Sequence, residues 1–476
     1  MTNISCIGHQ VAYELDNIKR LFEPYMTTDY EIESIYDKDK VYTLIYNHMQ
    51  IVCKNEQMVA LKGDALSDKK LIKNMLKKSL YEALVSITNI TMPWGTLTGI
   101  RPTKLVHDFQ KDGLSNKEIV TKLEEEYLVS KEKIDLMFLV AEKEKSVLEK
   151  NKDNEVSLYI GIPFCPTRCV YCSFTSYSLE KKENMVEAYL DALCKEIDYV
   201  AKEKGNLPIR SIYIGGGTPT SIKEAQLERL LRHIQSRFNT KNIEEYTLEA
   251  GRPDTITKEK LIIAKEFGVS RLSINPQSMN QKTLEAIGRR HTAKDIVEAY
   301  NLARQIGFDV INMDMILGLP GEDLSDVENT LNQLKQLNPD NITVHTLAIK
   351  RASILNENKE HYQITDAKNI EKMIALCQDR IQQMSLEPYY LYRQKNMLGN
   401  FENVGYAKKG KENIYNIQIM EEKQTILALG AGAITKIVYD HNQKIDRVPN
   451  VKNLEQYIDR IDEMIERKKE GFEKFI

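Results

Sequence analysis

The chain has 476 residues, of which 42% are hydrophobic and 28% charged, and its formal net charge is −3. This composition is ordinary for a soluble globular protein and gives no electrostatic reason to expect a nucleic-acid or acidic-membrane partner. No apolar run is long enough for a transmembrane segment, the first residues lack a secretory leader, and the seven cysteines fit a reducing compartment. We therefore expect a cytoplasmic protein of two or three domains.

Residues 1–150 are predicted to form a separate α+β module of unknown role. Residues 41–51 and 58–62 have strand patterns separated by a polar turn near Asn55. Helical periodicity is found in three segments: 71–90, 118–127 and 134–148. The segment 93–102 contains the one tryptophan and is predicted to be a packed loop, with a lid or docking segment as the alternative. The polar residues 149–155 are the best linker in the chain.

Residues 156–350 alternate between short apolar runs and amphipathic stretches. Six segments are predicted strands: 157–162, 211–214, 246–250, 271–275, 310–315 and 341–346. Five segments between them have helical periodicity: 185–201, 223–238, 258–267, 293–306 and 327–337. Strand–helix alternation indicates parallel strands with crossover helices, so we expect a closed or partly closed (β/α)6 barrel. In such barrels the chemistry gathers where the strands end.

The alternation fades beyond residue 355, and residues 355–476 are predicted to be a small C-terminal accessory region. Residues 366–384 and 453–469 have helical patterns, and residues 389–392 look extended. We expect this region to be able to close over the mouth of the barrel.

Three cysteines directly follow the first predicted barrel strand. Cys165, Cys169 and Cys172 have C-x3-C-x2-C spacing, which is too dense for core residues and odd in number for disulfides. Zinc is the alternative, but no second C-x2-C is present and the nearest histidines, His233 and His291, are far along the chain. Three thiolates from one loop would leave one iron of a [4Fe–4S] cluster without a protein ligand. The sequence therefore predicts a catalytic iron–sulfur site.

Glycines and polar residues follow the next strands in turn. The second strand runs into Gly215–Thr220, whose three glycines allow close backbone approach and free N–H groups to face a ligand. Four polar residues then lie at strand ends or shortly beyond them: Glu249, Gln277, Arg289 and Asp314. Together they favour a ligand with both an ammonium and a carboxylate, while each taken singly could form a structural ion pair.

These motifs resemble those of radical S-adenosylmethionine enzymes. The run Tyr159-Ile-Gly-Ile-Pro-Phe-Cys165 onward is similar to the oxygen-independent coproporphyrinogen III dehydrogenase family. The resemblance continues through residues 271–278, 288–291, 314–321, 399–406 and 429–433, the last two being similar to the HemZ branch. It covers roughly residues 157–440 and implies that the predicted barrel is a partial parallel radical-SAM barrel.

The resemblance also implies roles for particular residues. Cys165, Cys169 and Cys172 would ligate the cluster, whose fourth iron would bind S-adenosylmethionine, and Tyr159 would be the catalytic candidate. By position in the motifs, ten residues would contact S-adenosylmethionine: Tyr159, Tyr171, Gly216, Gly217, Thr218, Glu249, Gln277, Arg289, Asp314 and Ala348. A 5′-deoxyadenosyl radical would abstract hydrogen from a propionate, and loss of carbon dioxide and one electron would leave a vinyl group.

The implied partners are coproporphyrinogen III or another tetrapyrrole, and an electron donor such as a flavodoxin or ferredoxin. Cations are needed for the propionates, and the candidates are Arg252, Lys350, Arg351 and Arg393. The best-known dehydrogenases of the family have a fourth cysteine where this chain has Phe174. Relatives that act as haem chaperones share that lack, so two alternatives accompany the dehydrogenase: a haem-binding delivery protein and a radical methyltransferase acting on a tetrapyrrole.

Overall fold

The computed structural model describes residues 3–350, 353–394, 397, 400–439 and 444–473. The chain divides into two compact units. The first comprises residues up to 141 with short segments between 393 and 401, and the second comprises the remainder. Arg351, one of the candidate propionate partners, lies outside the described residues.

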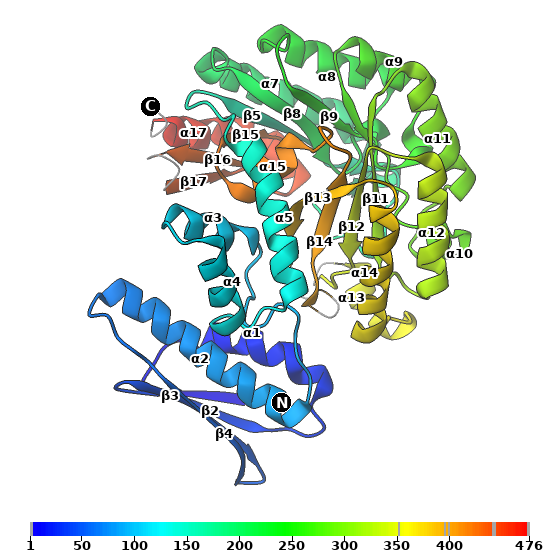
Figure 1. The fold of residues 1–476 in the computed structure, drawn as a ribbon. Coiled ribbons are helices and arrows are strands. Elements are labelled where there is room, and N and C mark those ends of the chain that lie inside the picture. Colours follow the sequence, from blue (N-terminus) through cyan, green and yellow to red (C-terminus); the bar gives the residue numbers. More distant parts are fainter. Residues whose placement is uncertain (1–2, 351–352, 395–396, 398–399, 440–443, 474–476) are drawn as a thin grey trace. The chain divides into compact units, whose positions relative to one another are not determined.

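The N-terminal unit contains a four-stranded sheet in the order β1-β2-β3-β4, in which β1 is parallel to β2 and the other pairs are antiparallel. Its elements are β1 (Asn3–Ile7), α1 (Ala12–Phe22), β2 (Glu31–Asp37), β3 (Lys40–Asn47), β4 (Gln50–Met58), α2 (Ala65–Thr88), α3 (Thr103–Lys111), α4 (Asn116–Glu125) and the first part of α5 (Lys131–Leu148) (Figure 1). Leu15, Ile18 and Phe22 recur at helical spacing on α1 and are fully buried, which fixes the face that α1 turns to the core.

The predicted strands of this unit differ from the observed ones. The run 41–51 is broken at His48 and Met49, which both have positive φ (47° and 62°) and form the turn between β3 and β4. A turn of this kind normally carries Asn or Gly, so these two residues gave no signal. Asn55, predicted to lie in a turn, is instead in the middle of β4.

The segment 93–102 is a packed loop, as predicted. Trp94 is fully buried, and the Arg393 guanidinium lies over its ring at 5.1 Å from the centroid. Arg393 also donates to the carbonyls of Leu97 and Asn400. Arg393 is thus built into the N-terminal unit, and the structure does not favour it as a propionate partner.

The second unit is built on an eleven-stranded sheet in the order β13-β14-β12-β11-β10-β9-β8-β5-β15-β16-β17. Six neighbouring strands are parallel, as predicted: β5 (Val156–Ile162), β8 (Ile209–Gly216), β9 (Glu245–Glu249), β10 (Arg271–Ser273), β11 (Val310–Leu317) and β12 (Asn341–Thr346). The end strands β13 and β17 do not pair with each other, so the sheet stays open. The prediction of a partial parallel (β/α)6 barrel is confirmed.

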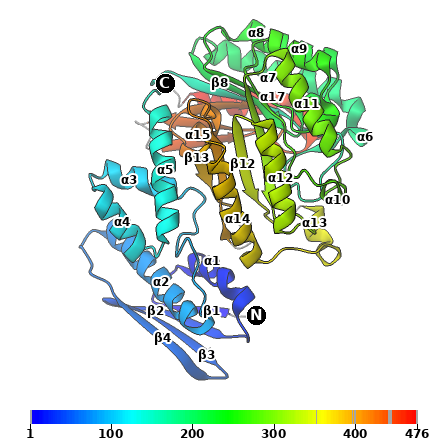
Figure 2. The ribbon, with the colours of Figure 1, turned by 45° about the vertical axis from the view of Figure 1, so that its right-hand side comes forward.

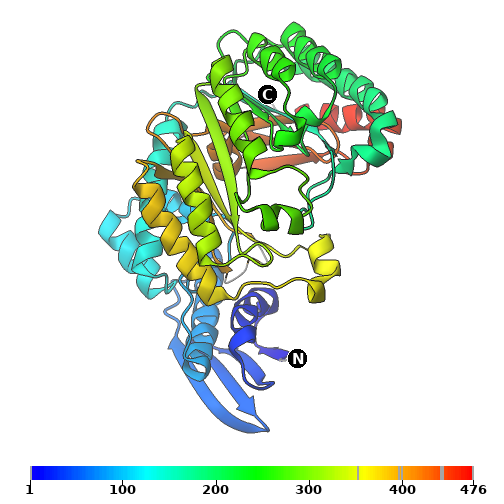
Figure 3. The ribbon, with the colours of Figure 1, turned by 90° about the vertical axis from the view of Figure 1, so that its right-hand side faces the viewer.

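The crossover helices lie in a row on the outer face of this sheet (Figures 1 and 3). They are α7 (Val186–Lys204), α8 (Glu224–Arg237), α9 (Lys258–Glu266), α11 (Ala293–Ile306) and α12 (Leu324–Leu337). On β5, Leu158, Ile160 and Ile162 are fully buried on one face, while Tyr159 and Gly161 alternate with them on the other. Each such aliphatic side chain contributes about 1.5–3 kcal/mol by burial. The opposite face of the same strands is therefore left for polar and aromatic groups.

The residues after 355 do not form a separate layer. Their strands extend both edges of the central sheet: β13 (Glu387–Tyr392) and β14 (Asn403–Ala407) beside β12, and β15 (Thr425–Leu429), β16 (Ile434–Tyr439) and β17 (Lys444–Pro449) beside β5. Figure 2 shows α14 (Ala367–Gln382) beside α12. The remaining helices are α6 (Leu179–Lys182), α10 (Gln281–Ala286), α13 (Ile354–Glu357), α15 (Ile414–Glu421), α16 (Leu454–Asp459) and α17 (Ile461–Phe472).

Helix α15 is attached at the amino-terminal end of the barrel strands. The N–H groups of Ile414 and Tyr415 both donate to the carboxylate of Glu245, the first residue of β9. The expectation that the C-terminal region covers the mouth of the barrel is therefore wrong for α15, because the mouth is at the carboxyl ends of the strands. In the part of the chain that the structure describes, no helix is long and apolar enough to cross a membrane.

Candidate functional site

The three cysteines lie in one loop after β5. Cys165 ends the short strand β6 (Phe164–Cys165), Cys169 is buried, and the Cys172 N–H donates to the Cys169 carbonyl at 3.1 Å. The pKa of the Cys165 thiol is raised to about 11, mainly by burial and also by the nearby Cys172 and Cys169, while the hydrogen bond from Thr218 opposes the increase. The three thiols interact electrostatically within one loop, and a cationic centre would favour their thiolate form, the form that ligates iron–sulfur clusters.

The cysteine loop is fixed by contacts from two neighbouring segments. Arg252 is 3% exposed, pairs with Asp254 (2.7 Å) and donates to Thr167 Oγ1 inside the loop (2.7 Å). The Val170 N–H donates to the Ile287 carbonyl at 3.2 Å. Arg252 is therefore occupied in holding the loop, and the structure does not favour it as a propionate partner.

The glycine triplet packs against the cysteine segment. A Cβ on Gly215 would lie 2.7 Å from the Tyr213 ring and 2.8 Å from Glu249 Oε2, and a Cβ on Gly217 would lie 2.6 Å from the Phe164 carbonyl oxygen. Gly216 has φ +113°, which favours glycine on its own account. The glycines therefore allow the turn to pack closely against β5, β6 and Glu249. The predicted close approach to a ligand stays a prediction.

The N–H groups of this turn, however, are used within the protein. Gly216 N–H donates to Glu249 Oε2 (3.1 Å), Gly217 N–H to the Ile162 carbonyl (2.9 Å), and Thr218 N–H to the Phe164 carbonyl (2.7 Å). The expectation that these groups face a ligand is wrong, because they bind the turn to β5 and β6. Thr218 Oγ1 additionally donates to Cys165 Sγ at 3.4 Å.

A stack of three tyrosines lies beside Glu249 on the inner face. The rings of Tyr159 and Tyr213 are 6.3 Å apart and nearly parallel, and Tyr415 from α15 stacks on Tyr213 at 4.4 Å. The Tyr213 hydroxyl donates to Glu249 Oε1 at 2.5 Å. Burial raises the pKa of Glu249 to about 7, with a further increase from Asp314 that the Tyr213 and Gly216 hydrogen bonds oppose. At neutral pH the Glu249 carboxyl group is therefore close to half ionised.

Gln277 and Arg289 present polar atoms that lack partners among the described residues. Gln277 has φ +65° and is 8% exposed, and its Oε1 accepts no hydrogen bond. Arg289 is 6% exposed; it donates to the Asn275 carbonyl (2.5 Å) and to the Tyr171 hydroxyl (3.4 Å), while its Nε is left over. A buried polar atom without a partner costs about 1–3 kcal/mol, which a polar ligand would recover.

Arg289 also connects this pair to the cysteine loop. Burial opposes its charge, but Tyr171 and Cys169 outweigh burial and raise the pKa of its guanidinium. Burial likewise raises the pKa of the Tyr171 hydroxyl, so this group stays neutral. The residues present therefore fit a cluster-bound amino acid: thiolate donors, a permanent cation and an amide oxygen occur together.

Asp314 lies on the inner face of β11 among hydrogen-bonding neighbours. Asn312 Nδ2 donates to its Oδ1 (2.7 Å), and His345 Nε2 is 3.6 Å from its Oδ2. Burial opposes its ionisation, but the contacts with His345 and Asn312 outweigh burial and lower its pKa. Ala348, half-buried after β12, forms an isolated antiparallel bridge with Met397, which gives no evidence about a ligand.

Three site residues were missed from the sequence. Tyr213 carries the hydroxyl that holds Glu249, and its inward position two residues before the glycines could have revealed it. His345 contacts Asp314, and its Nδ1 is hydrogen-bonded to the Tyr392 hydroxyl at 3.2 Å. Tyr415 gave no signal, because it reaches the stack from a helix far along the chain.

We expect Glu249→Gln to stabilise the protein more at high pH than at low pH. Folding raises the pKa of Glu249 from 4.5 to about 7, so the neutral carboxyl group is favoured in the folded protein. Its contribution to the free energy of unfolding is fully present below pH 4.5 and is lost as the pH rises through about 7. Glutamine never ionises, so its advantage in free energy of unfolding should grow by about 2 kcal/mol between about pH 5 and about pH 8, allowing for solvent screening. Urea unfolding at both pH values measures it, and an equal difference at both would contradict it.

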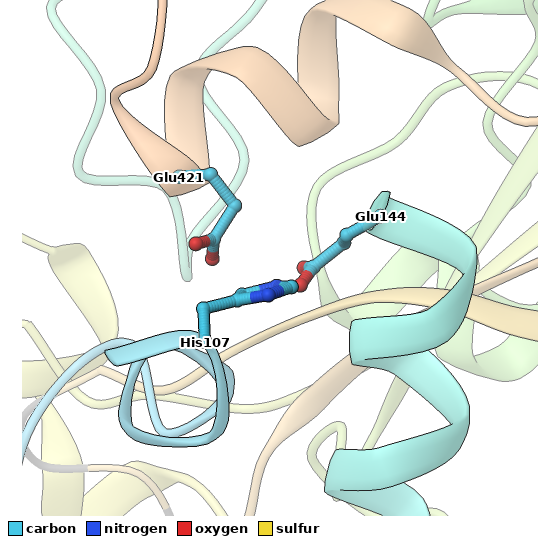
Figure 4. Close-up of side chains that lie close together, drawn as sticks. All are labelled: His107, Glu144 and Glu421. Atoms are coloured by element: carbon cyan, nitrogen blue, oxygen red, sulfur yellow. The ribbon is translucent and has the colours of Figure 1, made fainter. Parts of the chain in front are cut away.

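Two carboxylates away from the cysteines also lie close together. Glu144 of α5 and Glu421 of α15 have oxygens within 4.8 Å of each other (Figure 4). His107, also labelled there, belongs to the N-terminal unit. An acidic pair alone defines no metal site, so the cysteine loop is the metal-binding candidate of this unit.

The model of the Radical SAM superfamily matches residues 159–334, and the fold is that of this superfamily. The structure is similar to coproporphyrinogen III oxidase (HemN) from Escherichia coli, with a TM-score of 0.55 at 23% identity, over 68% of this chain and 73% of that one. This likeness shows the fold.

The sequence relatives define the family more narrowly. The chain is 42% identical to the oxygen-independent coproporphyrinogen-III oxidase-like protein HemZ of Bacillus subtilis, over 85% of this chain and 83% of that protein. It is 32% identical to the heme chaperone HemW of the same organism, over 64% of this chain and 76% of that protein. The chain belongs to the family of radical SAM proteins that contains HemZ, and the cofactors of this family are a [4Fe–4S] cluster and S-adenosylmethionine.

Proposed function

We propose that this protein is an oxygen-independent coproporphyrinogen III dehydrogenase, an oxidoreductase of porphyrin and heme biosynthesis. It would convert propionate side chains of coproporphyrinogen III to the vinyl groups of protoporphyrinogen IX. The observation that carries the proposal is the grouping of three shielded thiols with Gln277 and Arg289, whose polar atoms have no partners among the described residues. The relation to HemZ supports the choice of substrate class.

In this proposal Cys165, Cys169 and Cys172 hold the cluster. With S-adenosylmethionine bound and one electron from an external donor, this site would supply a 5′-deoxyadenosyl radical and release methionine. Arg289 is suited to a carboxylate because its guanidinium is a permanent cation, and Gln277 offers an amide oxygen to an ammonium group.

The inner face of the sheet supplies the remaining contacts. Glu249 and Asp314 offer carboxylate oxygens to hydroxyl or ammonium groups, and Tyr159 presents an aromatic face beside Gly216. Tyr159, whose ring stacks with those of Tyr213 and Tyr415, is the proposed catalytic residue. Tyr171, Gly216, Gly217, Thr218 and Ala348 complete the proposed set of contacts.

The substrate and electron partners are part of the same proposal. Arg252 and Arg393 hold parts of the protein itself. Lys350, the residue of the same candidate set that directly precedes Arg351, is proposed as a propionate contact, and burial lowers its pKa. A flavodoxin or ferredoxin would supply electrons in the cytoplasm, where an oxygen-sensitive cluster survives. We propose that residues 156–350 carry the chemistry, with residues 1–150 and 355–476 as accessory regions.

An anaerobic assay tests the function directly. Protein with reconstituted cluster, S-adenosylmethionine, reductant and coproporphyrinogen III should release carbon dioxide and form protoporphyrinogen IX, with no product when S-adenosylmethionine is omitted. Cleavage of S-adenosylmethionine without loss of carbon dioxide would contradict the proposed substrate while leaving the cofactor assignment intact.

A haem-binding delivery protein is the second candidate. Phe174 stands where the best-known dehydrogenases have a further cysteine, and its side chain is 71% exposed. An exposed aromatic ring beside the cysteine loop offers an apolar surface to a porphyrin. Stoichiometric haem binding without turnover of coproporphyrinogen III would favour this candidate, and Phe174→Ser would then weaken haem binding.

A further inference from the structure

The N-terminal sheet ends in an exposed edge strand. Strand β4 is nine residues long and, among the described strands, pairs only with β3, so a row of backbone N–H and C=O groups faces outward (Figure 1). Val52 and Met58 on this strand are 47% and 60% exposed. Proteins usually protect such an edge, because it is a template for pairing with another chain.

The charges on β4 are complementary to those of a second antiparallel copy. Residues directly opposite each other in an antiparallel pair share a face, so a two-fold axis between two copies passes through a residue. An axis through Asn55 places Lys54 opposite Glu56 of the second copy, and the reverse pair follows by symmetry. An axis through Lys54 or Glu56 would instead put like charges opposite each other, which is destabilising.

We propose that two copies of this chain associate through β4, antiparallel and centred on Asn55, which joins their four-stranded sheets. Lys54 and Glu56 are available for this, with side chains 56% and 35% exposed. Within one chain they are 3.6 Å apart, and Glu56 also accepts a hydrogen bond from Lys40 at 2.7 Å. On the inner face Asn55 and Gln57 donate to the Glu82 carboxylate, so the charge on that face is already hydrogen-bonded within each chain.

Charge reversal with complementation tests the proposal. Sedimentation equilibrium of the full chain at concentrations on the order of 100 μM should give twice the mass of one chain. In the proposed dimer of Lys54→Glu, both cross-strand pairs of positions 54 and 56 are Glu opposite Glu. In the dimer of Glu56→Lys, both pairs are Lys opposite Lys. Each variant alone should therefore dimerise about tenfold more weakly than the wild-type chain. An equimolar mixture of the two variants should recover the dimer, because both cross-strand pairs are then opposite in charge.

Lys40→Gln is the matched control. It removes the ion pair with Glu56 inside one chain but no contact of the proposed pairing, so its dimer should persist. Far-UV circular dichroism of each variant establishes that the sheet is intact, since exposed substitutions rarely cost more than about 0.5 kcal/mol. A monomeric wild-type chain, unchanged dimerisation of the single variants, or a mixture that stays monomeric would each overturn the proposal.

Discussion

Cys169→Ala is expected to abolish binding of the iron–sulfur cluster and with it all cleavage of S-adenosylmethionine. Cys169 is the most buried of the three loop cysteines and contacts Arg289, so its sulfur has no substitute close by. A cluster held by two thiolates has lost a protein ligand from an already incomplete set. Iron content, the visible absorption of the reconstituted protein and the yield of 5′-deoxyadenosine measure the effect.

Cys194→Ala is the control for that experiment. Cys194 is buried on α7 and is a free cysteine outside the loop, so its removal should leave iron content and cofactor cleavage unchanged. A Cys169→Ala protein with a full complement of iron and normal cleavage would overturn the assignment of the cluster ligands.

Lys468→Met is expected to destabilise the second unit by about 3–5 kcal/mol, because it leaves a buried carboxylate without its cation. Lys468 Nζ is 2.7 Å from Glu196 Oε1, and both side chains are fully buried. Glu196 also accepts hydrogen bonds from the Gly430 N–H (2.8 Å) and the Tyr457 hydroxyl (2.6 Å). The midpoint of thermal unfolding should fall by roughly 5–10 °C.

The same substitution should weaken retention of the cluster. The Tyr189 hydroxyl accepts from the Ala431 N–H and donates to the Gly161 carbonyl, four residues before Cys165. Ala431 directly follows Gly430, whose N–H group donates to Glu196. The hydrogen bonds of Glu196 therefore help to position Gly161 and the segment that leads into the cysteine loop. Iron content after gel filtration measures this effect.

Two further variants separate charge from packing. Adding Glu196→Gln to Lys468→Met removes the unpaired charge and should restore much of the lost stability. Lys469→Met, at an exposed position of the same helix, should change stability by less than about 0.5 kcal/mol. Equal losses at positions 468 and 469 would contradict the role given to the buried ion pair.

The barrel strands were predictable because short apolar runs alternate regularly with segments of helical periodicity, as parallel strands with crossover helices require. Leu158, Ile160 and Ile162 alternate with Tyr159 and Gly161, and the observed strand differs from the predicted one by a single residue. The β3–β4 hairpin was missed because its turn consists of His48 and Met49, which adopt positive φ, and not of the Asn and Gly that are usual in such turns.

The candidate site was also predictable only where its residues lie close together in the sequence. The proposed metal ligands are close in sequence, so the spacing of Cys165, Cys169 and Cys172 carries the information by itself. The role of Arg252 could not be predicted from the sequence. Whether an arginine binds a substrate or holds a loop depends on which carboxylate lies beside it in the folded protein. Asp254 and Thr167 take its charge and its hydrogen bonds.

The sequence by itself therefore determined the parallel barrel, the cysteine loop and the cofactor class, because all three rest on local spacing and strand alternation. Only the tertiary structure decided that the glycine N–H groups bind the protein itself, that Tyr213 and Tyr415 stack beside Glu249, and that α15 is attached at the amino ends of the strands. These features join residues far apart in the chain, and the partner of a buried polar group is set by packing rather than by sequence separation.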